Sequence, residues 1–110
     1  MIQKKRIAIL GSTGSIGTQA LEVVRSHREA FEVTVLVARR STELLIAQAL
    51  EFSPVVVVIS DEAYYPEVRQ ALSHTSIEVM AGSEAIAEDV VRPDVDIVLT
   101  AMVGFSGLVP

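Results

Sequence analysis

A short stretch with three glycines, Gly11-Ser12-Thr13-Gly14-Ser15-Ile16-Gly17, constrains this chain more than any other feature. It directly follows the apolar run Ile7–Leu10 and directly precedes a helical pattern that begins near Ser15. A strand that passes at once into a helix points backbone N–H groups, and the positive end of the helix dipole, at whatever lies above the turn. The sequence therefore predicts a phosphate-binding loop at this turn.

The three glycines of this stretch, called the glycine loop below, are spaced G-x-x-G-x-x-G, whereas the usual dinucleotide-binding motif is G-x-G-x-x-G. Glycine spacing alone is a weak signal, because any tight turn from a strand into a helix favours glycine. A tight turn without a ligand therefore stays open as the alternative. A P-loop is excluded, because no Gly-Lys-Ser/Thr follows and no lysine can reach a terminal phosphate.

Strand patterns and helical patterns alternate along the chain. The clearest strand is Val55–Ile59, whose five β-branched residues show no polar alternation, as is typical of a parallel strand covered on both faces. The expected strands are 6–10, 32–38, 55–59, 77–80 and 97–100, and the expected helices are 15–27, 41–52, about 61–72 and 82–91. This order predicts an α/β fold, namely a Rossmann-like, doubly wound, mostly parallel sheet with helices on both faces.

The spacing of apolar residues also predicts which face of each of the first two helices is buried. In the first helix this face comprises Ile16, Ala20, Val23 and Val24, and in the second it comprises Leu44, Leu45, Ala49 and Leu50. Ser41 or Thr42 is placed to cap the start of the second helix with its hydroxyl group.

The composition excludes several classes of protein. The 110 residues form one domain at most, and half of them are hydrophobic. No apolar run reaches the roughly 18 residues of a membrane span, and residues 1–6 lead directly into the first strand without a signal or transit peptide. With no cysteine there is no disulfide framework, so we expect a cytoplasmic protein. A net charge of −5 without a basic stripe argues against binding to nucleic acid.

No group of residues in the chain resembles catalytic or metal-binding machinery. His27 ends a charged helical segment and His74 lies in a polar turn, and neither has a second ligand at metal spacing. The carboxylates are scattered, and Ser106 is one residue short of the G-x-S-x-G motif. The sequence therefore predicts a nucleotide-binding site and assigns no catalytic or metal-ligating residue.

The end of the second predicted strand indicates which nucleotide binds. In dinucleotide-binding folds an acidic residue at this place accepts a hydrogen bond from the ribose 2′-hydroxyl and selects NAD. Here the sequence is Ala38-Arg39-Arg40-Ser41, and two guanidinium groups with a hydroxyl are suited to bind a 2′-phosphate. The alternative is that both arginines only solvate a turn. We expect NADPH to be the cofactor.

Three stretches together resemble the 1-deoxy-D-xylulose 5-phosphate reductoisomerase family. They occur in the family's order and span the whole chain: Leu10-Gly11-Ser12-Thr13-Gly14-Ser15-Ile16-Gly17-Thr18-Gln19-Ala20-Leu21, Leu50-Glu51-Phe52-Ser53-Pro54 and Ala101-Met102-Val103-Gly104-Phe105-Ser106-Gly107-Leu108. The resemblance implies an NADPH-dependent enzyme of non-mevalonate isoprenoid biosynthesis. Such an enzyme isomerises and reduces 1-deoxy-D-xylulose 5-phosphate to 2-C-methyl-D-erythritol 4-phosphate with a divalent metal, Mg or Mn, and is usually a homodimer.

The resemblance also implies which residues contact NADPH. They are Thr13, Gly14, Ser15 and Ile16 of the glycine loop, together with Arg39, Arg40 and Ser41 after the second strand. In the family this second turn commonly ends in asparagine, so Ser41 departs from the family pattern. The catalytic residues, the metal ligands and the site for the phosphosugar substrate lie beyond Pro110 in family members, so the resemblance places none of them in this chain.

We therefore expect residues 1–110 to be a truncated NADPH-binding domain of a longer enzyme, without the catalytic and C-terminal domains and inactive by itself. The apolar end of the chain, residues 101–110, supports this expectation because nothing in the sequence is left to pack on it. Two alternatives stay open. One is another NADP-dependent reductase with the same first domain, and the other is a stand-alone nucleotide-sensing module without catalysis. An Asn-Lys-Glu stretch soon after residue 110 would favour the reductoisomerase.

Overall fold

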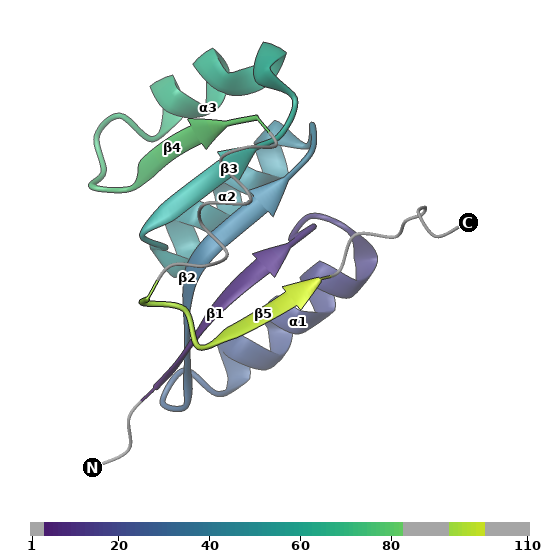
Figure 1. Cartoon of the computed structure of the whole chain (residues 1–110), viewed down its shortest axis with the longest axis vertical. Helices are drawn as coiled ribbons and strands as arrows, with labels where there is room; N and C mark the ends of the chain where they lie inside the picture. Colours follow the sequence, from purple (N-terminus) through teal and green to yellow (C-terminus); the bar gives the residue numbers. More distant parts are fainter. Residues whose placement is uncertain (1–3, 83–92, 101–110) are drawn as a thin grey trace.

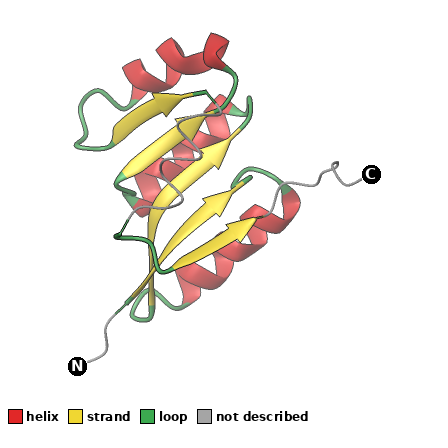
Figure 2. Ribbon diagram, viewed as in Figure 1, coloured by secondary structure: helices red, strands yellow, loops and turns green. Residues whose placement is uncertain are grey.

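The computed structural model describes residues 4–82 and 93–100, which form one layer of strands with helices packed against it (Figure 2). All neighbouring strands are parallel, and their order in space is β4-β3-β2-β1-β5. The strands are β1 (Lys5–Leu10), β2 (Phe31–Ala38), β3 (Val56–Ile59), β4 (Glu78–Ala81) and β5 (Ile97–Thr100). The helices are α1 (Ser15–Ser26), α2 (Thr42–Phe52) and α3 (Tyr65–Ala71), with a short 3₁₀ turn η1 (Glu62–Tyr64) before α3.

The predicted α/β, Rossmann-like parallel sheet is confirmed. The three helices of the described part lie on one face of the sheet, where their buried residues form a single cluster. Helices on the second face, which the sequence also predicts, stay a prediction for residues outside the described part. The helix expected over residues 82–91 falls almost entirely on residues 83–92, outside the described residues, and so does the resemblance motif at 101–108. Within the described part, no helix is both long and apolar enough to cross a membrane.

The path of the chain through the sheet explains why these helices share a face. From β1 the chain moves to β2, β3 and β4 in one direction, each time to the adjacent strand (Figure 1). Connections between parallel strands are right-handed, so equal steps in one direction place their helices on the same side. β5 then returns to the far side of β1. The direction in which successive strands are added across the sheet therefore reverses at β1. In sheets of this kind ligands bind at this reversal, beyond the carboxyl ends of the strands.

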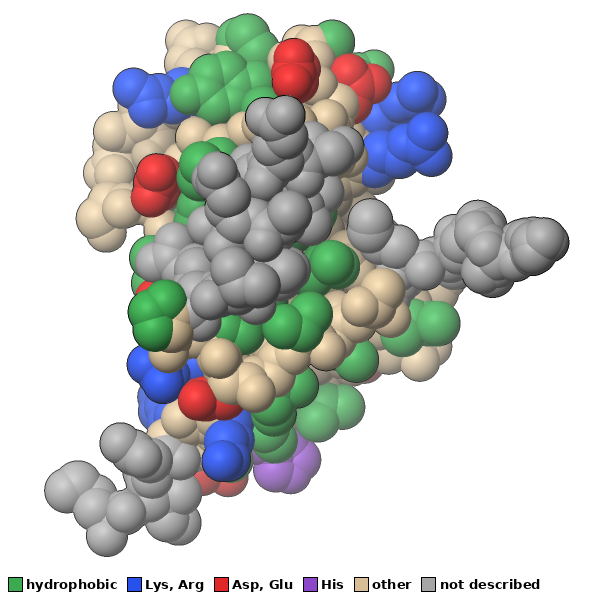
Figure 3. All heavy atoms as spheres, in the orientation of Figure 1, with side chains coloured by type: hydrophobic (Ala, Val, Ile, Leu, Met, Phe, Trp, Pro, Cys, Tyr) green, Lys and Arg blue, Asp and Glu red, His purple; other side chains and the backbone are tan. Residues whose placement is uncertain are grey.

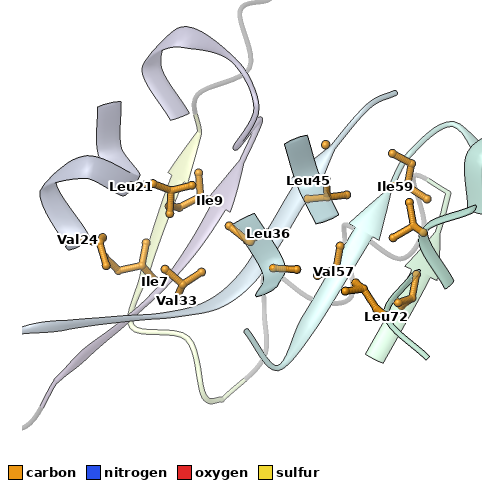
Figure 4. Close-up of a cluster of buried hydrophobic side chains, with 14 residues drawn as sticks. Ile7, Ile9, Leu21, Val24, Val33, Leu36, Leu45, Val57, Ile59 and Leu72 are labelled. Atoms are coloured by element: carbon orange, nitrogen blue, oxygen red, sulfur yellow. The ribbon is translucent and has the colours of Figure 1, made fainter. Parts of the chain in front are cut away.

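The main hydrophobic core lies between the sheet and the helices (Figure 4). Ile9 of β1, Leu36 of β2 and Leu45 of α2 belong to this cluster, and each of these side chains is fully buried. A smaller cluster occupies the other face of the sheet, and it contains Ala8, Val35, Val37, Val56 and Val58.

An irregularity in β2 decides which of its residues face the helices. Ile7 pairs with Val33 but Ala8 pairs with Val35, so Thr34 is an extra residue in the register. Because side chains alternate between the two faces, one extra residue shifts this alternation. As a result Val33 and Leu36 both belong to the core under the helices.

The predicted helix faces are partly wrong. Ile16 and Val23 are each 54% exposed, and Leu44 and Leu50 are also exposed. α1 buries Gly17, Leu21 and Val24, whereas α2 buries Thr42, Leu45, Gln48 and Ala49. The reason in α1 is steric, because Gly17 has to face the preceding loop and this fixes the rotation of the helix about its axis.

The predicted cap of α2 is also wrong. Ser41 occupies the capping position, but its side chain makes no capping hydrogen bond. The Thr42 hydroxyl donates to the Glu67 carboxylate at 2.9 Å, which joins α2 to α3 instead.

An ion pair joins α1 to α2 on the surface of the helical layer. Arg25 donates from Nε and Nη2 to the Glu51 carboxylate, with Nη2 and Oε1 2.9 Å apart, and Arg28 Nη2 lies 3.4 Å from Oε2. Both guanidinium groups also lie over the ring of Phe52, 5.4 and 4.8 Å from its centroid. The hydrogen bonds from Arg25 lower the pKa of Glu51 below its ordinary value of 4.5.

We predict that Glu51→Gln causes a small loss of stability at neutral pH and less at low pH. A carboxylate with a lowered pKa stabilises the fold above its unfolded pKa, and this contribution disappears as the pH falls through the folded value. The loss is small because both partners are well exposed. Denaturant unfolding of parent and variant between about pH 7 and about pH 3 measures this difference. A difference that does not shrink toward acid pH would contradict the assignment.

Candidate nucleotide-binding site

The two segments that the sequence marks for cofactor binding lie at the same edge of the sheet. The glycine loop follows β1, and the turn Arg39–Ser41, called the arginine turn below, follows β2. These two strands are adjacent and parallel, with Leu10 paired to Val37 (Figure 1). Figure 3 shows a group of basic side chains on the side of the molecule toward which the strands of Figure 1 point. The fold therefore brings the predicted site residues of both segments to one edge.

Gly11 and Gly17 are required by the fold itself. Gly11 has a φ of 87°, a left-handed conformation that residues with a Cβ atom avoid. A Cβ atom on Gly17 would lie 2.2 Å from the Gly11 carbonyl oxygen and 2.7 Å from Ser12 Cα. Only glycine lets α1 approach the end of β1 this closely. Backbone conformation and packing thus explain both residues without a ligand.

Gly14 is different, because the described protein atoms around it leave room for a side chain. Its φ of −79° and ψ of 176° are extended values that any residue adopts. A Cβ atom there would have the Gly11 carbonyl oxygen as its nearest described neighbour, at an ordinary contact distance of 3.6 Å. Gly14 is also exposed. A ligand that closely approaches the backbone would account for glycine at this position.

The start of α1 offers several unused hydrogen-bond donors. Among the described residues, the backbone N–H groups of Thr13, Ser15 and Ile16 have no acceptor, whereas Gly14 N–H donates to the Gly11 carbonyl oxygen at 3.2 Å. No side chain caps this end of α1, and its first turn holds no acidic residue. The donors and the helix dipole are therefore available to an anionic group.

The side chains of the loop are placed around these donors. Ser15 is exposed, Thr13 is half-buried and Ile16 is 54% exposed. The sequence pattern placed Ile16 on the buried face of the first helix, but in the structure it is not part of the core. Its apolar side chain lies instead at the start of α1, beside the free N–H groups.

The two arginines of the arginine turn have different surroundings. Arg40 donates from Nε to Asp61 Oδ2 at 3.0 Å, and Asp61 Oδ1 accepts from the Ala63 N–H at 3.1 Å. Arg39 is exposed and makes no ion pair within the described part of the chain. Ser41 is exposed as well. The turn thus presents one guanidinium group held by a carboxylate and one that extends into solvent.

Two residues near the site were not predicted from the sequence. Asp61 lies between β3 and η1, and its carboxylate holds Arg40. Gln48 of α2 is 6% exposed, and its Nε2 donates to the Ser12 carbonyl oxygen at 2.9 Å. A signal for Gln48 existed in the sequence, because it is a polar residue at helical spacing between Leu45 and Phe52 on a buried stripe.

No metal site is formed in this part of the chain. Within residues 4–82 and 93–100, no group of three or more His, Asp or Glu side chains lies close enough together to hold a metal ion. The divalent metal that the resemblance implies therefore has no set of ligands among these residues.

Comparisons with known proteins identify the relatives of this chain. Residues 7–110 match the sequence model of the family described as 1-deoxy-D-xylulose 5-phosphate reductoisomerase. The enzyme of that name from Bacteroides fragilis is 52% identical over 109 residues, which cover 99% of this chain and 28% of the relative. The chain thus spans little more than a quarter of the length of this curated relative.

Solved structures agree with this result. A crystal structure of a DOX-P reductoisomerase in complex with magnesium has a TM-score of 0.88 and 31% identity, and the match covers 96% of this chain and 27% of that one. The 1-deoxy-D-xylulose 5-phosphate reductoisomerase from Zymomonas mobilis in complex with NADPH has a TM-score of 0.75 and 31% identity, with 78% and 23% covered.

We predict that alanine destabilises the fold much more at Gly17 than at Gly14. Gly17→Ala should lower the free energy of unfolding by about 1–3 kcal/mol or more, because backbone atoms must move to admit the methyl group. Gly14→Ala should lower it by about 1 kcal/mol or less, as for a change at the capping position of a helix. Thermal or denaturant unfolding of both variants measures this, and equal losses would contradict the different roles of the two glycines.

Proposed function

The chain belongs to the 1-deoxy-D-xylulose 5-phosphate reductoisomerase family, and on this premise we propose that residues 1–110 are its NADPH-binding domain. The whole enzyme then isomerises and reduces 1-deoxy-D-xylulose 5-phosphate to 2-C-methyl-D-erythritol 4-phosphate, with its catalytic and C-terminal domains outside these residues. The observation that carries the proposal is the exposed Gly14, which lies among free N–H donors at the edge of the sheet that it shares with the arginine turn.

The glycine loop fits the pyrophosphate of a dinucleotide. The N–H groups of Thr13, Ser15 and Ile16 would donate to the phosphate oxygens, and the dipole of α1 would stabilise their negative charge. The missing side chain of Gly14 would let the phosphate reach the backbone. Ile16 is exposed beside these donors and would contact the bound nucleotide with its apolar side chain.

The arginine turn fits the 2′-phosphate that distinguishes NADPH from NADH. Arg39 is free to form a charge-assisted pair with this phosphate, and Arg40 keeps its terminal nitrogens because Asp61 accepts only from Nε. The Ser41 hydroxyl would add a neutral donor. When bound, NADPH supplies the hydride for the reduction, and these residues hold its adenosine end.

Other parts of the proposal concern the whole enzyme. The magnesium complex of the solved relative supports a divalent metal, Mg or Mn, whose ligands lie outside the described residues. The substrate would be a small phosphosugar, and residues 1–110 alone would be inactive. A homodimer in the cytoplasm, without a nucleic-acid or membrane partner, completes the proposal.

We predict that the protein binds NADPH more tightly than NADH, and that the arginine turn causes the difference. Arg39→Ala and Arg40→Ala should each weaken NADPH binding by about 1–3 kcal/mol and leave NADH binding nearly unchanged, because only NADPH carries the 2′-phosphate. Titration of the parent and both variants with each nucleotide tests this. Equal affinities of the parent for the two nucleotides would refute the 2′-phosphate assignment.

We also predict that Gly14→Ala weakens NADPH binding more than its loss of stability explains. The described protein accommodates the methyl group, so the variant should remain folded while the methyl group intrudes on the phosphate. Affinity and melting temperature are measured on the same preparation. If the folded variant binds NADPH as tightly as the parent, the glycine loop is not the phosphate site.

A further inference from the structure

We propose that Gln48 is a positioning residue for the cofactor, because it fixes the direction of the Thr13 N–H group in the glycine loop. This inference rests on the proposed function of the loop as the pyrophosphate site. Gln48 lies in α2, which is not adjacent to the loop in sequence, and it acts on the cofactor only through the backbone of Ser12.

Two long-range contacts hold the first half of the glycine loop. On the side of β2, the Val37 carbonyl oxygen accepts from the N–H groups of Gly11 and Ser12 at 2.8 and 2.9 Å. On the side of α2, Gln48 Nε2 donates to the Ser12 carbonyl oxygen at 2.9 Å. Ser12 is 0% exposed and Gln48 is 6% exposed, so this second contact is shielded from water.

The contact with Gln48 determines where the next N–H group points. The Ser12 carbonyl and the Thr13 N–H belong to one peptide unit, which is planar and trans, so the two groups point in opposite directions. Because Gln48 holds the Ser12 carbonyl toward the interior, the Thr13 N–H has to point away from it. That N–H has no acceptor among the described residues. Gln48 therefore directs one of the donors that would bind the pyrophosphate.

Stability alone does not explain an amide at this position. Gln48 Oε1 and the Ser12 hydroxyl oxygen are both buried without a hydrogen-bond partner in the described part of the structure. An unpaired buried acceptor is destabilising, so an apolar residue would suit the fold at least as well. Leu45 and Ala49 are apolar side chains of this kind on the same face of α2. The amide at position 48 is accounted for if its function is to hold the glycine loop.

The test is Gln48→Met in the full chain that contains these residues, with NADPH and NADH as the two ligands. Methionine has a similar volume but no donor, and it also removes the unpaired Oε1, so the melting temperature should change little. Both nucleotides carry the pyrophosphate, so both should bind about tenfold more weakly, with an unchanged ratio of their affinities. Leu45→Val is the matched control, because it removes a buried methylene from the same helix without altering the contact with Ser12.

The possible results separate this inference from the proposed function. If the parent binds NADPH and Gln48→Met binds it equally well, Gln48 does not position the loop. A loss confined to NADPH would also overturn the inference, since it would place the effect at the arginine turn. An equal loss of affinity in Leu45→Val would show that destabilised α2 is the cause. A parent that binds neither nucleotide would overturn the proposed function itself, and the role of Gln48 with it.

Discussion

The structure of the site depends on the close approach of α1 to the end of β1. At Gly17 the helix comes so near the loop that a Cβ atom would lie 2.2 Å from the Gly11 carbonyl oxygen. This contact fixes the rotation of α1, so the residues that follow Gly17 on its buried side are Leu21 and Val24. The same rotation leaves Ile16 exposed beside the free N–H groups. One steric requirement thus sets both the core face of the helix and the surface that would meet the cofactor.

The parallel sheet supplies the second condition for the site. Because β1 and β2 are adjacent and parallel, the loops that follow them lie at the same edge, although 27 positions separate Ser12 from Arg39 in the sequence. β2 lies on one side of β1 and β5 on the other, so the order of strands across the sheet reverses at β1. Arg6 of β1 joins this strand to the start of β5. Its backbone N–H and its guanidinium group both donate to the Asp96 carboxylate and lower the pKa of Asp96. The glycine loop therefore lies at the place where sheets of this kind bind nucleotides.

Side chains from later elements complete the site. Asp61, just before η1, holds the Nε of Arg40, and Gln48 from α2 holds the Ser12 carbonyl. Each contact leaves the group that would bind the nucleotide free: the terminal nitrogens of Arg40 in one case and the Thr13 N–H in the other. In both cases a residue outside the segment that carries the donor determines the direction of that donor.

The sequence by itself determined the α/β class, the order of the strands and helices, and the two segments that form the candidate site. These features depend on local signals: β-branched runs such as Val55–Ile59, and glycines where a strand passes into a helix. The tertiary structure alone decided which helix faces are buried, which glycine is free to serve a ligand, and that Gln48 and Asp61 contact the site. The contacts of Asp61 and Gln48 join residues 21 and 36 positions apart in the chain, and the buried face of α1 depends on how closely this helix packs against the loop before it. Local periodicity contains no information about such contacts, because they form only when separate elements pack together.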